Sequence, residues 1–525
     1  MSAALQGRRT GQPASLTSVD GEVEPMDLER LDLDAFRDRP VAVLGLARSG
    51  ISLARFLVDR GARVTVYDVR LAERLGEAIE ALQGRPVRML LGPAVDPREA
   101  LLGQALVCTS PSVSSRYPTT EPRLRGALGR LEAEARVPVV SEVDLFLRLC
   151  PALTVGVTGT KGKTTTSSLI AAVLSAGRDP VLLGGNIGMP LIEHLPSLAS
   201  SHRVVLELSE LQLPTMARGT DVAVYTHVTA DHLDRHGSLE AYRTVKRRLA
   251  ELLPSQGALV LNADDPVSAD YTAATPPGTA LVRYRRGAPE AGEVGLVGGW
   301  IVARDVIQLP ALGDDHEADD QEERLIRADE LLIPGAHNVS NALAAAAVGK
   351  LLRIPPEGIR AALRAFTGVE HRLEPVTTID GVRFINDSQG TQPDAVIAAL
   401  RSFPRPLVLI AGGRSKGLPM EELAAVAAER IDAAVLMGES GPGLAVNLKA
   451  AGVDRLESAR DMPEAVAIAE VIARELLATG GVAPATVLLS PAATSFDMFE
   501  DYAARGRAFK ASVADLAGTK RGGTP

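Results

Sequence analysis

The chain is poor in cysteine, in aromatic residues and in long apolar runs, and each shortage excludes a class of protein. Its two cysteines, Cys108 and Cys150, support neither a disulfide framework nor a metal cluster, and both lie in apolar runs where we expect inert core thiols. Aromatic residues make up 3% of the sequence and the net charge is −9. These values argue against nucleic-acid binding, which needs basic stripes and aromatic stacking residues.

Other features are those of a globular protein. No apolar run approaches the ~20 residues that cross a membrane. The 525 residues are enough for about three domains. Residues 1–35 are rich in Gly, Pro, Ser and Glu and contain no apolar segment of a signal peptide, so we predict a disordered N-terminal extension. We therefore expect a cytoplasmic protein with no nucleic-acid partner and no membrane span.

The stretch from Leu153 to Thr166 is the most informative in the chain. An apolar strand is followed by Gly159-Thr-Lys-Gly-Lys163 and then by Thr164, which opens a helix. Glycines let backbone N–H groups face a phosphate, Lys163 reaches the terminal phosphates and the hydroxyl of Thr164 suits Mg²⁺. Val157 stands where the usual phosphate-loop pattern has glycine. The alternative is a strand-to-helix turn without a ligand; the order of the elements favours binding of a nucleoside triphosphate.

A second glycine-containing turn lies near the beginning of the chain. The strand at 41–45 leads into Gly45-Leu-Ala-Arg-Ser-Gly50, and a second strand ends at Asp68, followed by Arg70. This resembles a dinucleotide fingerprint, in which the turn binds a diphosphate and the acid accepts from a ribose hydroxyl or a base N–H. A nicotinamide-dependent oxidoreductase, a nucleotide-sugar site and a purely structural turn all remain open. Ser110-Pro111 follows another strand at the same expected edge.

Polar residues also follow the strands of the central region. Glu207 lies in an apolar strand, where a carboxylate is costly unless it is paired or bound to metal. His232 lies beyond the next strand with two acids, and together with Glu207 and Thr164 it predicts a metal site rather than a surface loop. Asn186, in a turn-rich loop, is suited to positioning a ligand. Residues 280–330 are expected to be β-rich, with an exposed acidic loop at 313–324.

Two further features have both a structural and a functional interpretation. Lys246 lies among arginines on a predicted helix, and by itself this pattern indicates a solvated basic face. Asn338 and Asn341 open an alanine-rich helix, where asparagine either caps the helix or contacts an adenine edge. Beyond residue 371, strands alternate with helices again, which predicts a third parallel sheet with polar loops at its strand ends.

Taken together, these motifs resemble the Mur ligase family from about Val41 to Lys510. The family's motifs occur in order: the phosphate loop at 158–164, Asn186, Glu207-Leu-Ser-Glu210, His232-Leu-Asp-Arg235, Asn262-Ala-Asp-Asp265, His337-Asn338, His371-Arg372, Asn386-Asp387-Ser388 and Leu489-Ser-Pro-Ala492. The first glycine turn and Ser110-Pro111 favour the branch that adds D-glutamate to UDP-N-acetylmuramoyl-L-alanine.

The resemblance implies a three-domain α/β fold. A UDP-binding Rossmann-like domain is expected at 36–148. A central ATP-binding, P-loop ATPase-like domain with a mostly parallel sheet is expected at 149–370, and an amino-acid-binding Rossmann-like domain at 371–525. It also implies ATP as substrate, Mg²⁺ (two ions) and a carbamylated Lys246. We expect a monomer, and because the binding sites of three domains must converge, we predict closure of the third domain about a hinge near His371.

The resemblance further implies roles for individual residues. The catalytic set would be Lys163, Lys246 and His232, and the metal ligands Thr164, Glu207, His232 and Lys246. ATP would be bound by Gly159, Thr160, Lys161, Gly162, Lys163, Thr164, Thr165, Asn338, Arg372 and Asp387. The UDP-substrate would be bound by Gly45, Ser49, Gly50, Asp68, Arg70, Ser110 and Asn186. The amino acid would be bound by Thr391, Lys416, Ser495 and Tyr502.

The sequence departs from the family pattern at a few places. The family commonly has D-S-K-A-T-N where this chain has Asp387-Ser-Gln-Gly-Thr-Gln392, Tyr502 replaces a phenylalanine, and Ser112 replaces a glycine. The departures concern amino-acid selectivity and one ATP contact, so addition of L-glutamate or another amino acid remains an alternative. A non-catalytic nucleotide- or UDP-sugar-binding protein is the alternative of another class.

Overall fold

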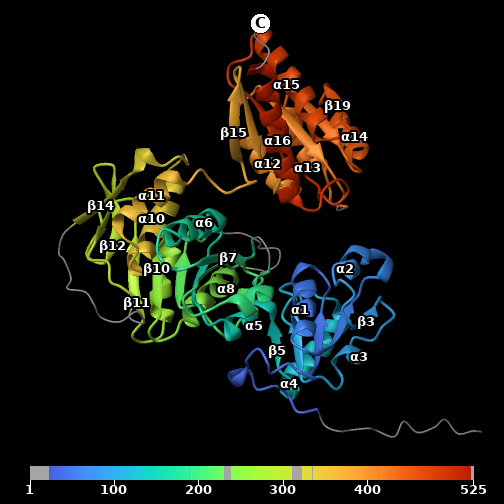
Figure 1. Ribbon diagram of the computed structural model, residues 1–525, viewed down its shortest axis with the longest axis vertical. Coiled ribbons are helices and arrows are strands. Elements are labelled where there is room, and N and C mark those ends of the chain that lie inside the picture. Colours follow the sequence, from blue (N-terminus) through green and yellow to red (C-terminus); the bar gives the residue numbers. More distant parts are fainter. Residues whose placement is uncertain are drawn as a thin grey trace, which may run out of the picture.

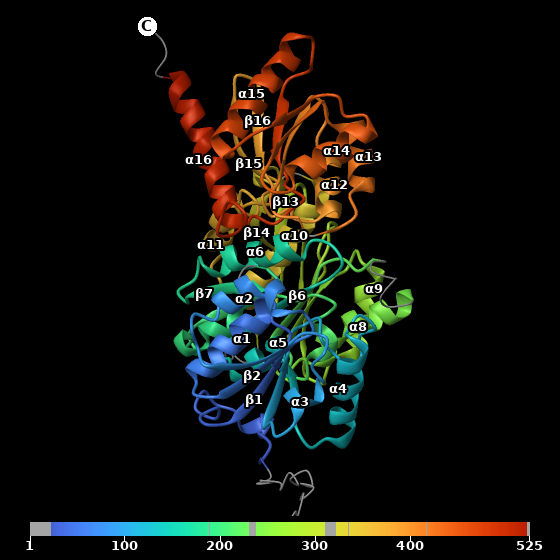
Figure 2. The same ribbon diagram turned by 90° about the vertical axis from the view of Figure 1, so that its right-hand side faces the viewer.

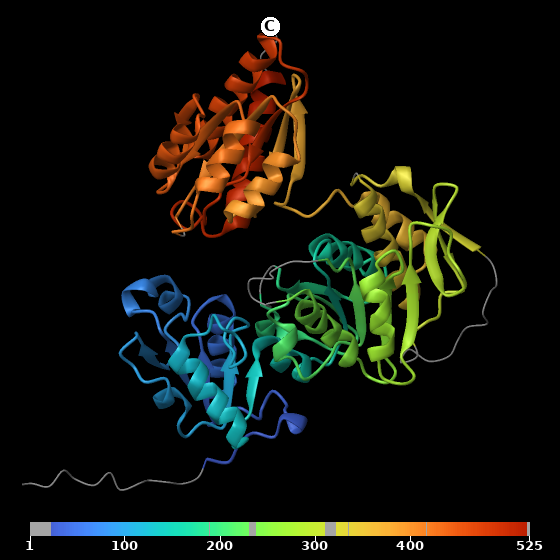
Figure 3. The same cartoon turned by 180° about the vertical axis from the view of Figure 1, so that it is seen from behind.

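The computed structural model describes residues 23–187, 190–229, 238–309, 322–333, 335–415 and 417–521, with side chains to residue 518. These residues form three α/β domains, each built on its own sheet. Figures 1 and 3 show the domains in chain order, with a single extended segment leading from the second to the third.

The first domain contains a parallel sheet in the order β3-β2-β1-β4-β5. Strand β1 lies at its centre, and its apolar residues are buried because helices cover both faces of such a sheet. The strands are β1 (Pro40–Leu44), β2 (Arg63–Asp68), β3 (Val87–Leu91), β4 (Leu106–Thr109) and β5 (Val139–Ser141). The helices are α1 (Arg48–Asp59), α2 (Gly76–Glu80), α3 (Arg98–Leu101), α4 (Pro122–Glu134) and α5 (Glu142–Leu149), with 3-10 turns η1 (Leu28–Arg30) and η2 (Ala72–Arg74).

The second domain contains a nine-stranded sheet in the order β14-β13-β12-β11-β10-β9-β6-β8-β7. It is parallel from β7 to β12, and β13 and β14 add antiparallel strands at one edge. The strands are β6 (Leu153–Thr158), β7 (Val181–Gly185), β8 (Arg203–Glu207), β9 (Val222–Tyr225), β10 (Ala258–Asn262), β11 (Ala280–Tyr284), β12 (Glu293–Val297), β13 (Trp300–Arg304) and β14 (Glu322–Arg327).

The helices of the second domain include α6, which follows the phosphate loop, and α10, which packs against it. They are α6 (Lys163–Leu174), α8 (Leu239–Glu251), α9 (Pro266–Ala269), α10 (Ala336–Leu351) and α11 (Pro356–Ala365), with 3-10 turns η3 (Leu191–Ser197), η4 (Leu213–Thr215), η5 (Asp270–Ala274) and η7 (Ala328–Glu330). The predicted β-rich region is confirmed. The predicted acidic loop is wrong at its end, because 322–324 belong to β14; residues 313–321 lie outside the described residues.

The third domain contains a mixed sheet in the order β15-β16-β20-β17-β18-β19. The prediction of a parallel sheet is confirmed for β16, β20, β17, β18 and β19, and it is wrong for β15, which pairs antiparallel with β16 through a tight turn at Asp380-Gly381. The strands are β15 (Glu374–Ile379), β16 (Val382–Asn386), β17 (Leu407–Gly412), β18 (Ala433–Met437), β19 (Leu456–Ser458) and β20 (Ala485–Leu489). The helices are α12 (Pro393–Arg401), α13 (Glu421–Arg430), α14 (Gly441–Ala451), α15 (Met462–Ala478) and α16 (Tyr502–Arg521).

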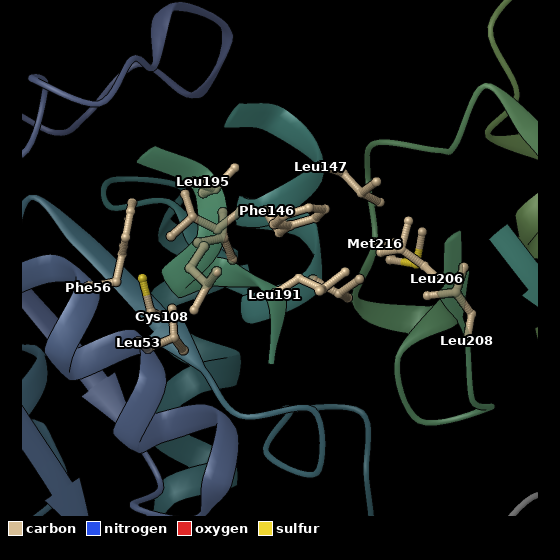
Figure 4. Close-up of a cluster of buried hydrophobic side chains, with 14 of the residues drawn as sticks. Leu53, Phe56, Cys108, Phe146, Leu147, Leu191, Leu195, Leu206, Leu208 and Met216 are labelled. Atoms are coloured by element: carbon tan, nitrogen blue, oxygen red, sulfur yellow. The ribbon is translucent and has the colours of Figure 1, made fainter. Parts of the chain in front are cut away.

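The first two domains share one hydrophobic core. Side chains of α1 and β4 pack with Phe146 of α5, and the same cluster continues through η3 to Leu206 of β8 and Met216 (Figure 4). Cys108 belongs to this core and burial raises the pKa of its thiol, as expected for an inert group, and burial raises the pKa of Cys150 to about 11. Among the described residues, the hydrophobic clusters of the third domain include no residue of the other two.

Residues 23–35, predicted as part of a disordered extension, lie against the first domain. Met26 is buried in the shared core, and its N–H donates to the carbonyl oxygen of Ala105 at 2.9 Å. Residues 1–22 lie outside the described residues, and the domain boundaries remain predictions. None of the helices within the described ranges is both long and apolar enough to cross a membrane.

Candidate active site

The phosphate loop lies at the carboxyl end of β6, which lies between β8 and β9 in the second sheet. Gly159 and Gly162 adopt φ values of 146° and 87°, which residues with side chains rarely adopt. A Cβ at Gly159 would overlap the hydroxyl of Thr226, and one at Gly162 would lie 2.7 Å from Oδ1 of Asn341. Glycine is therefore required at both positions, and the prediction of a glycine-dependent turn leading into α6 is confirmed.

Neighbouring strand ends hold this loop in place. The N–H of Thr160 donates to the carbonyl oxygen of His227 at 2.7 Å, and the hydroxyl of Thr226 donates to that of Lys161 at 2.7 Å. Nζ of Lys163 donates across the loop to the carbonyl oxygen of Thr160 at 2.9 Å. Thr164 is buried and Thr165 half-buried in the first turn of α6, whose N-terminus favours an anion. The loop thus presents a preorganised cationic cradle.

Glu207 ends β8 beside the strand of the phosphate loop, opposite Val157 in the parallel register. It is 2% exposed; Oε1 accepts from Nδ2 of Asn186 at 2.8 Å, whereas Oε2 is buried and has no hydrogen-bond partner among the residues that the structure describes. A buried carboxylate oxygen without a partner is costly, and a divalent cation with oxygen ligands would satisfy it. The donor chemistry of Glu207 and Thr164 therefore fits Mg²⁺.

Of the other two predicted metal ligands, the structure describes Lys246 but not His232, which lies outside the described residues. Within the described ranges, no three His, Cys, Asp or Glu residues cluster as a metal site. Asn186 is exposed and bonded to Glu207, so the structure brings a predicted substrate-binding residue next to a predicted metal ligand.

Lys246 is fully buried, so the interpretation of a solvated basic face is wrong for this residue. Its Nζ lies 3.4 Å from Oγ1 of Thr158, the last residue of β6, and 5.4 Å from the ring centroid of Tyr242. Arg243, Arg247 and Arg248 on the same helix are half-buried. The helical repeat buries Lys246 together with Tyr242 and Leu249, beneath the phosphate loop, and leaves the three arginines partly accessible. Its carbamylation remains a prediction.

A cavity of about 470 Å³ adjoins the phosphate loop. It lies between the ends of β9, β10 and β11 and the start of α10, and its lining includes Lys161, Gly162, Thr226, His227, Asn262, Asp264, Tyr284, Arg286, His337, Ser340 and Asn341. Sequence reasoning did not assign Asp264, Tyr284 or Arg286 to the site. Asp264 belongs to a motif that was noted, but the pairing of its Oδ2 with the backbone N–H of Arg286 at 2.9 Å depends on the parallel register of β10 and β11.

The two asparagines of α10 are joined to each other and to α6. Nδ2 of Asn341 donates to Oδ1 of Asn338 at 3.1 Å, and Oδ1 of Asn341 accepts from the hydroxyl of Thr166 at 3.1 Å. The N-cap of the helix is Gly335, so the capping interpretation of these asparagines is wrong. Asn341 lines the cavity and Asn338 is hydrogen-bonded to it, and contact of either amide with an adenine remains a prediction.

The glycine turn of the first domain gathers most of the residues predicted for the UDP-substrate. Gly50 packs so closely on the carbonyl oxygen of Gly45 that a Cβ would overlap it, and the hydroxyl of Ser110 donates to that same oxygen at 3.1 Å. Ser49 is half-buried in the first turn of α1. The turn therefore has the close backbone approach that a diphosphate loop requires.

Asp68 is buried beside this turn. Its Oδ2 accepts from the N–H of Leu46 at 2.8 Å and from Nη2 of Arg70 at 2.7 Å, and Oδ1 accepts from Nε of Arg70 at 2.9 Å. Burial raises the pKa of Asp68, but the hydrogen bonds from Arg70 and from backbone N–H groups outweigh it, so the net pKa is lowered. Asp68 thus positions Arg70, which is the more accessible of the two, at 47% side-chain exposure.

The third domain reaches the phosphate loop through Arg372, whose Nη1 donates to Oγ1 of Thr164 at 3.1 Å. Asp387 lies nearby at the end of β16, where Leu373 N–H and Ser490 Oγ donate to its carboxylate at 3.1 and 2.7 Å. Burial raises the pKa of Asp387 to about 6. His371 and Leu373, at the predicted hinge, have φ values of 63° and 44°, so the chain turns sharply there.

The residues predicted for the amino acid lie on loops of the third domain. Thr391 follows β16, Ser495 follows β20 and is buried, and Tyr502 begins α16 with its ring 6.2 Å from that of His371. Parallel β16 and β20 end at the same edge of the sheet, so the loops are neighbours. Lys416 lies outside the described residues.

Three protein-domain families match successive parts of the sequence. They are the MurD-like N-terminal domain of Mur ligases over residues 39–127, the Mur ligase middle domain over 157–349 and the Mur ligase glutamate ligase domain over 371–492. The chain is 38% identical over 477 residues to the UDP-N-acetylmuramoylalanine–D-glutamate ligase of Symbiobacterium thermophilum, covering 90% of this chain and 98% of that protein.

Other relatives extend this similarity. The UDP-N-acetylmuramoylalanine–D-glutamate ligase of Pelotomaculum thermopropionicum is 37% identical over 487 residues, covering 92% of this chain and 99% of that protein. Among solved structures, the UDP-N-acetylmuramate–alanine ligase of Thermotoga maritima has 19% identity and a TM-score of 0.48, covering 91% of this chain and all of that one.

Proposed function

This chain belongs to the Mur ligase family, and we propose that it joins D-glutamate to UDP-N-acetylmuramoyl-L-alanine in an ATP-dependent amide ligation of peptidoglycan precursor synthesis. The observation that carries this proposal is the similarity to D-glutamate ligases across all three domains, at 38% identity over 90% of the chain. The reaction would take place in the cytoplasm, in a single chain that contains a complete set of sites.

The chemistry requires activation of a carboxylate, because oxide is a poor leaving group. Transfer of the γ-phosphoryl group of ATP to the alanyl carboxylate gives an acyl phosphate, from which phosphate departs when the uncharged amine of D-glutamate attacks. Two anions must approach each other in the first step, so positioning and charge neutralisation dominate the catalysis.

The residues of the phosphate loop are suited to that first step. We assign Lys163 to the γ-phosphate, which would exchange its bond to the Thr160 carbonyl for one to phosphate oxygen. The backbone of Gly159, Thr160, Lys161 and Gly162 would hold the remaining phosphate oxygens, with Thr164 and Thr165 at the N-terminus of α6. Arg372 would add positive charge from the third domain, next to Thr164.

We assign the metal to the edge formed by Thr164 and Glu207, completed by His232 and by a carboxylated Lys246. Bound Mg²⁺ supplies charge neutralisation between the two reacting anions. Glu207 also orients Asn186 through their hydrogen bond, which would link metal binding to the position of the muramoyl portion. Asn338 and the cavity beside it would accept adenine.

The other substrates would be bound by the outer domains. We assign the uridine diphosphate to the turn from Gly45 to Gly50 with Arg70, positioned by Asp68, and to Ser110. D-glutamate would lie against Thr391, Lys416, Ser495 and Tyr502. Closure of the third domain about His371 would bring the amine to the acyl phosphate.

The test is phosphate release from the purified protein with ATP, Mg²⁺ and UDP-N-acetylmuramoyl-L-alanine, with D-glutamate, L-glutamate, meso-diaminopimelate or L-alanine supplied in turn. We expect release that requires D-glutamate and is abolished in Lys163→Ala. Release with another amino acid would keep the reaction class and overturn the acceptor assignment. ATP binding without release would favour a non-catalytic binding protein, and binding of a nicotinamide cofactor would favour an oxidoreductase.

A further inference from the structure

Arg505 is a fully buried cation in the third domain that the proposed reaction does not yet use. It lies in the first turn of α16 and is 1% exposed. Its Nε donates to Oγ of Ser388 at 3.0 Å, Nη2 donates to the carbonyl oxygen of Ser388 at 2.9 Å, and Nη1 donates to that of Ala493 at 3.2 Å. All three acceptors are uncharged.

No carboxylate of the described residues lies within 4 Å of this guanidinium. Burial lowers the pKa of Arg505 to about 10, with the charge of Asp497 opposing that shift, so the group stays cationic at neutral pH. Asp501 precedes the helix, and its carboxylate accepts the N–H of Ala504 at 2.6 Å. A buried charge is normally paired with an opposite charge, because its desolvation is otherwise uncompensated. Within 4 Å, Arg505 therefore contacts uncharged acceptors in the described part of the chain, and the carboxylate whose charge acts on it, that of Asp497, lies farther away.

The surroundings of Arg505 are the loops predicted to bind the acceptor. Ser388 begins the loop that carries Thr391, and Ala493 belongs to the loop that carries Ser495, so the guanidinium bonds both loops at once. The loop after β17 also closes on it, since a Cβ at Gly413 would lie 3.1 Å from Nη1 of Arg505. Ligands of open α/β sheets lie at such strand ends.

The helix end adds to this positive field. The N-terminus of α16 carries a partial positive charge, and in Figures 1 and 2 this end of the helix is directed toward the other two domains. Tyr502, at the first position of the helix, has its carbonyl oxygen bonded by Oγ of Ser388 at 2.7 Å, the same hydroxyl that accepts from Arg505. The cation and the acceptor loops are therefore one hydrogen-bonded unit.

We propose that Arg505 is a specificity-determining positioning residue, which makes the third domain select an acceptor amino acid with an anionic side chain. It acts through the Ser388 and Ala493 loops and by its electric field, without touching the substrate. A carboxylate bound in front of these loops adds a second counter-charge to that of Asp497, whereas an uncharged acceptor of the same shape does not. This inference rests on the proposed ligase function and refines it.

The test compares D-glutamate with its uncharged isostere D-glutamine as acceptors. In the wild type we expect kcat/KM to favour D-glutamate at least a hundredfold, with the difference mainly in KM. Arg505→Met should lower kcat/KM for D-glutamate by tenfold or more and change that for D-glutamine less than threefold. Arg505→Lys, which keeps the charge, should retain most of the preference. Arg507→Met, at an exposed arginine two positions along the same helix, is the matched control.

The outcomes separate this inference from the proposed function. A wild type that is inactive with every acceptor would overturn the ligase function itself. A wild type that uses D-glutamate but prefers it less than tenfold over D-glutamine would overturn the assignment of Arg505 alone, whether or not the variants fold. Equal losses for both acceptors in folded Arg505→Met, with unchanged KM values for ATP and the UDP-substrate, would show a purely structural residue and would also overturn it.

Discussion

Arg372 donates a hydrogen bond from Nη1 to Oγ1 of Thr164 at 3.1 Å, across 208 residues of sequence. It joins the third domain to the first turn of the phosphate-loop helix. A second polar contact, an ion pair between Arg414 and Glu77, joins the third domain to the first. Since the third domain shares no hydrophobic cluster with the others in the described part of the chain, such polar contacts position it, and a domain held in this way moves readily.

Replacing Arg372 by methionine tests the cross-domain contact. The guanidinium is placed to stabilise charge that develops on the transferred phosphoryl group, and loss of such a donor typically costs about 100-fold or more in kcat. We expect kcat for phosphate release to fall by that order, with a smaller change in the KM for D-glutamate. Arg401→Met, at an exposed arginine of α12, is the control. A fall of less than about threefold would mean that Arg372 only tethers the domain.

Glu207→Gln tests the metal assignment. The substitution removes the charge that would bind Mg²⁺ but keeps an oxygen for the hydrogen bond from Asn186. We expect the Mg²⁺ concentration for half-maximal activity to rise about tenfold or more. Without Mg²⁺ the melting temperature should stay the same or rise, because a buried unpaired anionic oxygen is lost.

Magnesium titrations of phosphate release and thermal melts without magnesium measure both effects. Glu240→Gln, at an exposed glutamate on α8, serves as control. An unchanged magnesium dependence together with a lower melting temperature would assign Glu207 a structural role instead.

Carbamylation of Lys246 predicts a dependence of activity on carbon dioxide. The buried Nζ lies beneath the phosphate loop, 3.4 Å from Thr158, and a carbamate there would convert a cation into a metal-binding anion. We expect activity to fall when the enzyme is kept in CO₂-depleted buffer and to recover on addition of bicarbonate. Lys246→Ala should be inactive and insensitive to bicarbonate. Full activity of the wild type after exhaustive CO₂ removal would contradict the modification.

The buried carboxyl group of Glu142 should make the stability of the protein depend on pH. It lies at the start of α5, between the first two domains, and burial raises its pKa from 4.5 to about 7, against a hydrogen bond from the N–H of Ile192 and the charge of Arg48. Between pH 4.5 and about pH 7, Glu142 holds its proton in the folded protein but has lost it in the unfolded chain. The free energy of unfolding therefore falls as pH rises through this range. The loss is on the order of 3 kcal/mol by pH 8.

Glu142→Gln should remove this contribution, so the melting temperatures of variant and wild type should differ more at pH 8 than at pH 5, in favour of the variant. Asp387, with a pKa raised to about 6, also lowers the stability as pH rises. Because it is present in both proteins, its effect cancels in the difference between their melting temperatures. A difference that is the same at both pH values would show that Glu142 titrates normally.

Much of the architecture could be predicted from local patterns in the sequence. Apolar strands, glycine turns and helix starts are short-range features, because backbone sterics and hydrogen bonding act between neighbouring residues, so the strand, turn and helix at 153–166 were predicted correctly. Burial of Glu207 was likewise predicted from its apolar neighbours. The antiparallel strand β15 at the edge of the third sheet was not predicted, because its pairing with β16 is a contact that only the folded sheet shows.

The sequence by itself determined which residues are available at the ends of the strands, and what chemistry they have: a lysine and threonines after β6, an acid at the end of β8, a lysine on α8. Only the tertiary structure decided their environment. Lys246 is buried because α8 packs that face on the sheet, one oxygen of Glu207 has no hydrogen-bond partner among the described residues, and Arg505 is buried between two loops that it joins by hydrogen bonds. Burial and pairing arise from segments far apart in the chain, and such long-range contacts leave no mark in local sequence.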